Sequence, residues 1–127
     1  MPTASLAALR VILSLHLLGV LLQAALAGQF LSGLEGPVVF HEVTGWIVLG
    51  VSLVQVLFSA LWSRRGGPLW FVLVSIFVTI AEALQVGTGY GRFLGVHVPL
   101  GVMLFGAVLW QLVWVFRRPA EPSGISA

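Results

Sequence analysis

The sequence predicts an all-α protein, a four-transmembrane-helix bundle made of two tandem helical hairpins. Three observations predict it. The chain of 127 residues is 59% hydrophobic and only 8% charged, with a mean hydropathy of +1.09. A soluble domain carries about 25% charged residues, so lipid is the expected solvent for most of this chain. Four apolar segments each exceed the length of about 18 residues that a spanning helix needs, and the second and fourth share one sequence pattern.

The four predicted spans cover Leu6–Leu31, Val38–Trp62, Pro68–Val86 and Phe93–Phe116. The connections between them, SGLEGP, SRRGGP and GTGYGR, are rich in glycine, proline and charge, which is typical of turns. We therefore expect one bundle over residues 1–118 and a disordered cytoplasmic tail over residues 119–127.

The arginines predict the orientation. One arginine pair follows the second span and another follows the fourth, whereas Arg92 alone lies at the opposite end of the bundle. The positive-inside rule then places both termini in the cytoplasm. His41 and His97 fall near the outer face, and the chain is expected to be a multi-pass protein of the cell membrane, most simply a prokaryotic inner membrane.

The first span also resembles a secretory signal peptide, because an arginine precedes its apolar run and Ala25 and Ala27 form a cleavage-like site. The internal repeat needs this span as the first helix of a hairpin. We therefore expect it to be retained.

The repeat is clearest in FHEVTGWIVLGVSLVQ and VHVPLGVMLFGAVLWQ, which both read H-x3-G-x4-G-x4-Q. A weaker match between LQAALAG and AEALQVG places Gln23 opposite Glu82. The pattern indicates two hairpins in the same orientation, related by a pseudo-two-fold axis along the membrane normal. The matched pairs of the stronger repeat are His41 with His97, Gly45 with Gly101, Gly50 with Gly106, and Gln55 with Gln111.

This symmetry predicts a cofactor site. It places His41 and His97 at one depth, and if their helices are diagonal in the bundle the imidazoles face each other, as a six-coordinate haem iron requires. A residue four positions along lies about 40° from the histidine, on the same face. Gly45 and Gly101 would therefore leave a flat surface for the porphyrin edge. We predict one haem b per chain, with the two histidines as metal ligands.

The other matched residues have structural interpretations. Gly50 and Gly106 lie about 180° from the histidines, which predicts close packing against a neighbouring helix. Gln55 and Gln111 return to the inner face, which predicts a hydrogen bond across the bundle near its cytoplasmic side.

Three further polar side chains are functional candidates, each with a plainer alternative. His16, near the middle of the first span, either binds a quinone head group or relays a proton, or it only hydrogen-bonds a helix carbonyl. Glu82 is the candidate catalytic residue, as a proton-transfer acid, or it supports a ligand's ring N–H, or it is an interfacial carboxylate. Arg92 either pairs with haem propionates or anchors lipid phosphate.

The residues around both histidines resemble a known family. FHEVTGWIVLG and LGVHVPLGVMLFG are similar to motifs of the haem A synthase family, and the bundle resembles one four-helix half of it. The resemblance implies that His41 and His97 are axial ligands. Two departures weaken the implied oxidising chemistry: Glu42 stands where arginine is typical, and Pro37 or Val38 holds the place of the family's catalytic carboxylate.

Two other resemblances are more general. The chain is similar to small uncharacterised four-span bacterial membrane proteins with the same two histidines. It is more distantly similar to the ascorbate-reducible dihaem cytochromes b, but its cytoplasmic helix ends carry no histidine, so at most one such haem is expected.

The leading functional hypothesis is a membrane haem b protein that transfers electrons near the outer face, with a quinone or another membrane or extracytoplasmic redox subunit as partner. One alternative is a haem-modifying enzyme, and another is a non-enzymatic accessory subunit of a membrane complex. The sequence does not decide whether the chain is an enzyme. The absence of cysteine excludes disulfides, thiolate metal sites and C-x-x-C-H haem attachment. There is no nucleic-acid-binding motif, so no nucleic-acid partner is expected.

Overall fold

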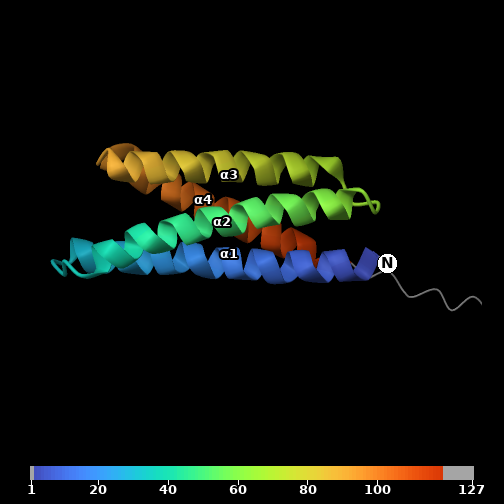
Figure 1. Cartoon of the computed structure of the whole chain (residues 1–127), viewed down its shortest axis with the longest axis horizontal. Coiled ribbons are helices and arrows are strands. Elements are labelled where there is room, and N and C mark those ends of the chain that lie inside the picture. Colours follow the sequence, from blue (N-terminus) through green and yellow to red (C-terminus); the bar gives the residue numbers. More distant parts are fainter. Residues whose placement is uncertain (1, 119–127) are drawn as a thin grey trace, which may run out of the picture.

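The computed structural model describes residues 2–118. Its elements are α1 (Pro2–Leu31), α2 (Pro37–Ser63), α3 (Leu69–Tyr90) and α4 (Leu94–Phe116) (Figure 1). All four helices are long and apolar enough to cross a membrane. This confirms the predicted all-α class with four candidate spans. The tail predicted over residues 119–127 lies outside the described residues.

The boundaries follow the turn chemistry, but two helices are clearly longer than predicted. The first predicted span started at Leu6, whereas α1 begins at Pro2. We predicted that the third span ends at Val86, but α3 continues to Tyr90. Gly87 and Gly89 were read as part of a turn, yet the helix continues through both of them. Glycine only weakens a helix, by about 1 kcal/mol relative to alanine, so packing overrides it here.

The helices form a four-sided bundle. Each helix packs against its neighbour in sequence, and α4 packs back against α1, whereas the backbones of α1 and α3, and of α2 and α4, lie apart across the diagonals. Figure 1 shows that α2 leaves α1 to approach α3, while α4 leaves α3 to approach α1. The two hairpins therefore diverge towards the end that carries the α1–α2 and α3–α4 connections. We call this the histidine end, because His41 and His97 lie near it, and the other the arginine end, because Arg64 and Arg117 lie there.

Three helices end in the same type of turn. The backbone is left-handed at Gly33, Gly66 and Arg92, with φ of 94°, 100° and 55°. After each of these residues, the next amide donates to a carbonyl five residues back: Leu34 to Gln29, Gly67 to Trp62, and Phe93 to Thr88, at 3.2, 3.0 and 2.9 Å. This is the Schellman pattern, which usually has glycine at the left-handed position. Only Arg92 departs from that preference.

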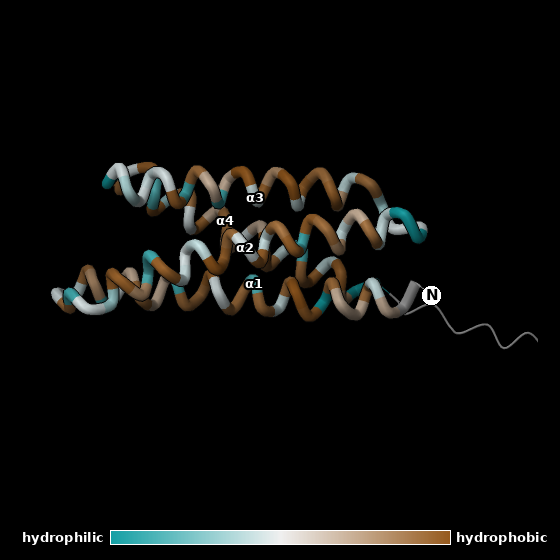
Figure 2. Tube along the Cα trace, in the orientation of Figure 1, coloured by the Kyte–Doolittle hydropathy of each residue, from teal (hydrophilic) through white to brown (hydrophobic). Residues whose placement is uncertain are grey.

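The bundle is apolar outside and contains polar side chains inside. Phe77 and Leu31 on the outer surface are 71% and 70% exposed. Figure 2 shows hydrophobic residues along all four helices and a distinctly hydrophilic loop between α2 and α3. An apolar exterior of this extent is expected where lipid replaces water. The buried polar residues are Ser5, His16, Ser52, Gln55, Ser59, Ser75, Glu82 and Gln111.

Two apolar clusters flank the buried polar residues. One lies towards the arginine end, where the rings of Trp62 and Phe71 meet edge to face with centroids 5.7 Å apart. Such aromatic pairs contribute about 0.5–1.5 kcal/mol beyond their burial. The second cluster comprises Val78, Ala81, Leu104 and Val108. On α4, Gln111 lies between Val108 of the second cluster and Val115 of the first, so the polar group is enclosed from both sides.

The predicted packing role of Gly50 and Gly106 is wrong within this chain. A Cβ added at either position would meet no atom within 4 Å. Gly19 instead makes the close approach between α1 and α2, since a Cβ there would lie 2.8 Å from Val48 Cγ2. The sequence pattern placed Gly50 and Gly106 away from the histidines correctly, but their face of the helix has no neighbour.

Candidate functional site

The two predicted ligand histidines face each other across the bundle. His41 on α2 and His97 on α4 come from helices on one diagonal, and their ring centroids are 6.0 Å apart with an angle of 64° between the planes. Both side chains are partly buried. The sequence pattern required the two helices to be diagonal, and the structure places them so.

Each histidine ring is held by a backbone carbonyl of its own hairpin. His41 Nδ1 donates to the carbonyl of Gln23 on α1 at 3.1 Å, and His97 Nδ1 donates to the carbonyl of Gln85 on α3 at 2.9 Å. An imidazole that donates through Nδ1 carries its lone pair on Nε2. The two hydrogen bonds therefore set the tautomer in which Nε2 can bind a metal ion, as second-shell carbonyls do for metal-binding histidines.

Gln85 was not anticipated as the partner of His97. The weaker part of the repeat paired Gln23 with Glu82, but the residue that does for His97 what Gln23 does for His41 is Gln85. The shift of three residues keeps the same face of α3, which is why the sequence did not distinguish the two. The segment AEALQ contains both Glu82 and Gln85. Its glutamine is the same residue type as Gln23, and this match is the feature from which the partner of His97 could have been predicted.

The glycines one turn beyond the histidines contact amides. A Cβ at Gly45 would lie 3.5 Å from Gln23 Nε2, and a Cβ at Gly101 would lie 2.9 Å from Gln85 Nε2. We expected these glycines to leave an open surface for a porphyrin edge. Instead the side chain of the glutamine whose backbone holds the histidine ring lies at each glycine. At Gly101 the amide is too close for a Cβ, whereas at Gly45 a Cβ would make an ordinary contact.

Gly89 makes the approach of His97 to α3 possible. A Cβ at this position would lie 3.0 Å from His97 Cε1 and 3.2 Å from Nδ1, closer than side chains normally pack. Thr88 Oγ1 lies 3.5 Å from the same Nδ1. Gly89 therefore lets the ring reach the carbonyl of Gln85, a role that the sequence did not reveal.

The distance between the two ring centroids is about that of two imidazoles that bind one metal ion. Two imidazole nitrogens at about 2 Å from a shared ion, with each ring centre about 1 Å beyond its nitrogen, require ring centres about 6 Å apart. Within residues 2–118, no group of three His, Cys, Asp or Glu side chains is placed to hold a bare ion. A donor set of two opposed imidazoles suits a metal that brings its other ligands with it, as haem iron does.

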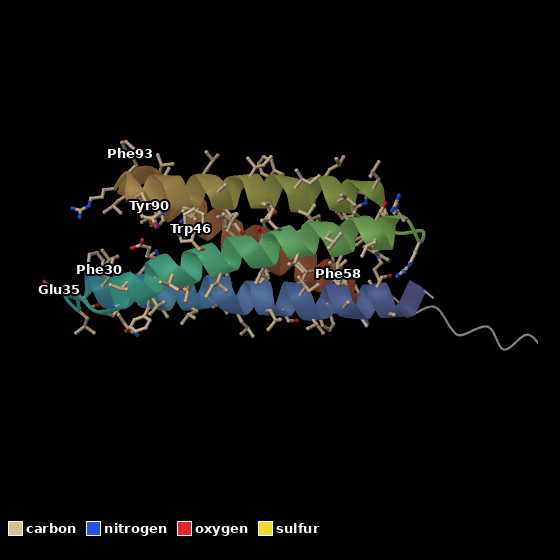
Figure 3. All side chains as sticks on the ribbon, viewed as in Figure 1. Phe30, Glu35, Trp46, Phe58, Tyr90 and Phe93 are labelled. Atoms are coloured by element: carbon tan, nitrogen blue, oxygen red, sulfur yellow. The ribbon has the colours of Figure 1, made fainter. Side chains whose placement is uncertain are left out.

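A hydrogen-bonded bridge joins the two hairpins beside the histidines. Trp46 Nε1 donates to the Tyr90 hydroxyl at 3.0 Å, and that hydroxyl donates to Glu42 Oε1 at 2.6 Å. Figure 3 shows Trp46 and Tyr90 directed towards one another between the diverging hairpins. The bridge connects α2 to the end of α3, so it limits how far the hairpins separate at the histidine end.

Arg92 lies in the turn between α3 and α4, five residues before His97, and is exposed. Its left-handed backbone costs a residue with a Cβ about 1–2 kcal/mol relative to glycine. A strained residue that occupies a position suited to glycine is a candidate for function. The left-handed backbone of Arg92 therefore supports the choice of this residue as a functional candidate.

His16 and Glu82 form a buried pair in the middle of the bundle, away from the two facing histidines. His16 Nε2 is paired with Glu82 Oε1 across the α1–α3 diagonal. His16 Nδ1 donates to Gln55 Oε1 at 2.6 Å. Glu82 therefore does not support a ring N–H of either facing histidine, and His16 does not bond only to a helix carbonyl.

The pair continues into a network of amides and hydroxyls. Gln55 Nε2 donates to Gln111 Oε1 at 3.1 Å, which confirms the predicted hydrogen bond across the α2–α4 diagonal. Both glutamine amides also donate to Ser75 Oγ, at 3.2 and 3.1 Å, and Ser59 Oγ lies 3.1 Å from the same oxygen. Ser75 is the centre of this network, which the sequence pattern did not indicate.

Comparisons with known proteins give no relative. No protein-family model matches the chain, and no curated protein or solved structure matches it.

Proposed function

We propose that the chain is an integral membrane haem b protein in which His41 and His97 are the axial ligands. The observation that carries the proposal is the pair of facing rings, 6.0 Å apart, each held through Nδ1 by a carbonyl of its own hairpin. This arrangement leaves a lone pair on each Nε2 atom, and the ring centroids are about as far apart as two imidazoles on one iron require.

Held by His41 and His97, a bound haem would supply one-electron transfer. The chain's own residues position the two ligands and limit access. Gln23 and Gln85 fix the tautomers, and the bridge from Trp46 to Tyr90 connects the hairpins beside the ligands. Arg92, in the turn at the same end, is our proposed partner of the anionic propionates.

We further propose an arrangement in the cell membrane of a prokaryote, with the histidine end outside. Its support is the arginine pairs at the opposite end of the bundle, which the positive-inside rule places in the cytoplasm. The matching roles of Gln23 and Gln85 support an origin by hairpin duplication. A quinone, or another membrane or extracytoplasmic redox subunit, is the proposed electron partner at the outer face.

The haem-modifying alternative has less support. Resemblance to the haem A synthase family suggested it, and it needs a free carboxylate at the facing histidines. The candidates were Glu82 and Glu35. Glu82 is engaged by His16, and Glu35 is exposed in the α1–α2 connection; Glu42 accepts a hydrogen bond from Tyr90. The accessory-subunit alternative, in which the histidines only bond between helices, is distinguished by the spectrum below.

The experiment is an absorption spectrum of the chain purified in detergent from haem-supplied cells, oxidised and then reduced with dithionite. We expect a sharp α-band on reduction that is lost in His41→Ala and in His97→Ala. The matched control is His16→Gln, which changes the remaining histidine and should keep the band. Folded wild-type protein with no haem band would overturn the proposal and favour the accessory-subunit alternative.

A further inference from the structure

The His16–Glu82 pair has an arrangement of hydrogen atoms that follows from its neighbours. Gln55 Oε1 can only accept, so His16 Nδ1 carries the proton of that hydrogen bond. The contact between His16 Nε2 and Glu82 Oε1 therefore holds one further proton, shared between the two atoms. In this state the pair is neutral overall, which is the state that a low-dielectric bundle favours.

The second carboxylate oxygen of this pair is buried without a partner. Within residues 2–118, Glu82 Oε2 and Gln85 Oε1 are buried side-chain oxygens that have no hydrogen-bond partner. Glu82 itself is only 4% exposed. A buried polar atom left unpaired costs about 1–3 kcal/mol, so an arrangement of this kind calls for an explanation.

The two residues that carry these oxygens lie three positions apart on α3. Residues three apart on a helix lie on one face, with about 5–6 Å between their Cβ atoms. Two acceptors cannot satisfy each other, but a proton on Glu82 Oε2 would convert it into a donor towards Gln85 Oε1, directly or through one water. A single added proton thus turns the unpaired carboxylate oxygen into a hydrogen-bond donor.

Gln85 also connects this location to the proposed haem ligand. Its backbone carbonyl accepts from His97 Nδ1 at 2.9 Å, while its side-chain oxygen is buried without a partner. On α1, His16 lies seven residues from Gln23, which holds the other ligand; this is about 10 Å along the helix. A change of charge between the ligands therefore acts on the pair through an apolar interior that screens it poorly.

We propose that the pair of His16 and Glu82 binds one proton from the aqueous phase when the haem iron gains one electron. This inference rests on the proposed function. One electron from an external one-electron reductant converts ferric to ferrous iron and removes one positive charge. One proton from water then forms the O–H bond at Glu82 Oε2, which leaves His16 as a cation and restores the charge of the bundle interior.

The helices around the pair carry few other ionisable side chains. The titratable side chains of the four helices within residues 2–118 are Arg10, His16, His41, Glu42, Glu82, Tyr90 and His97. The groups that α2 and α4 direct into the network are the uncharged amides of Gln55 and Gln111. From α3, Glu82 and the Ser75 hydroxyl face it. Glu82 is thus the acidic group of the network.

The test is a redox titration of the haem-loaded protein in detergent, followed by the α-band, over a series of pH values from 5 to 9. A tenfold change in proton concentration shifts a one-electron couple that takes up one proton by about 59 mV. We expect the wild-type midpoint potential to fall with rising pH over part of this range with a slope approaching that value. We expect Glu82→Gln, which keeps a hydrogen-bonding side chain, to hold haem and to lose the slope. The control Glu35→Gln removes an exposed loop carboxylate and should leave the slope unchanged.

A second measurement covers the case in which Glu82→Gln does not fold. Reduced-minus-oxidised infrared spectra of the wild-type protein should show the C=O stretch of a buried carboxylic acid appearing on reduction. A flat potential, an unchanged slope in Glu82→Gln, or the absence of that band would overturn the inference while the haem band stands. Absence of haem from the folded wild-type protein would instead overturn the proposed function, so the two failures are distinguishable.

Discussion

The ring of His97 packs against Gly89 so closely that a Cβ at the glycine would lie 3.0 Å from Cε1. The same contact brings Nδ1 within 2.9 Å of the Gln85 carbonyl. The position of this proposed ligand therefore depends on the absence of a side chain in the last turns of α3.

We expect Gly89→Ala to displace the His97 ring and weaken its hydrogen bond to Gln85. Loss of a second-shell partner typically reduces metal affinity by about 10–100-fold. The measurement is haem binding by the apo-protein, followed by absorbance. Gly87→Ala is the matched control, because a Cβ there meets no atom within 4 Å and should leave haem affinity intact. Equal affinities for the two variants would show that the contact does not position the ligand.

The buried pair predicts a non-additive effect on stability. His16→Leu or Glu82→Leu alone leaves the other partner unpaired in the bundle, and we expect a loss of about 1–3 kcal/mol for each. The double variant should lose less than the sum, because replacing both members removes the unpaired group. Thermal unfolding in detergent, followed by circular dichroism, measures all three. Strict additivity would contradict the pairing.

We expect one substitution at Arg92 to change the stability of the bundle and its haem affinity in opposite directions. Arg92→Gly removes a Cβ from a left-handed position, so we expect the bundle to gain about 1 kcal/mol in stability. The same change removes the proposed partner of the propionates, so haem affinity should fall. Gly33→Ala is the converse control, because it introduces a Cβ at the equivalent left-handed position of the α1–α2 turn and should destabilise. Unchanged haem affinity in Arg92→Gly would favour a role in lipid anchoring.

The bridge at the histidine end predicts an effect on haem release. Tyr90→Phe removes the hydroxyl that accepts from Trp46 and donates to Glu42. Each hydrogen bond contributes about 0.5–1.5 kcal/mol, so we expect haem to dissociate several-fold faster. Transfer of haem to an excess of an apo-globin measures the rate. An unchanged rate would mean that the bridge does not limit separation of the hairpins.

Several features could be predicted from the chain because they depend on local or repeated patterns. Apolar segment length predicted four helices, and the H-x3-G-x4-G-x4-Q repeat predicted that His41 and His97 face each other and that Gln55 bonds to Gln111. A repeat in one orientation fixes relative depth, and depth with helical periodicity fixes which side chains can meet across a diagonal.

Other features could not be predicted because they depend on how one helix is rotated and tilted against another. The sequence placed Glu82 opposite Gln23, and both Glu82 and Gln85 lie on the same face of α3. Only packing decides that Gln85 holds His97 while Glu82 reaches His16, 66 positions away.

The sequence by itself therefore determined the number of helices, their apolar exterior and the opposed histidine pair. Hydropathy and periodicity are properties of single segments, and the repeated sequence pattern extended them to one relationship between two helices. The tertiary structure alone decided the partners of the buried polar groups and the roles of the glycines. Such partners are chosen by interhelical distances of a few ångström, because a carboxylate and an imidazole in an apolar interior are stable only where hydrogen-bonding groups from other helices meet them.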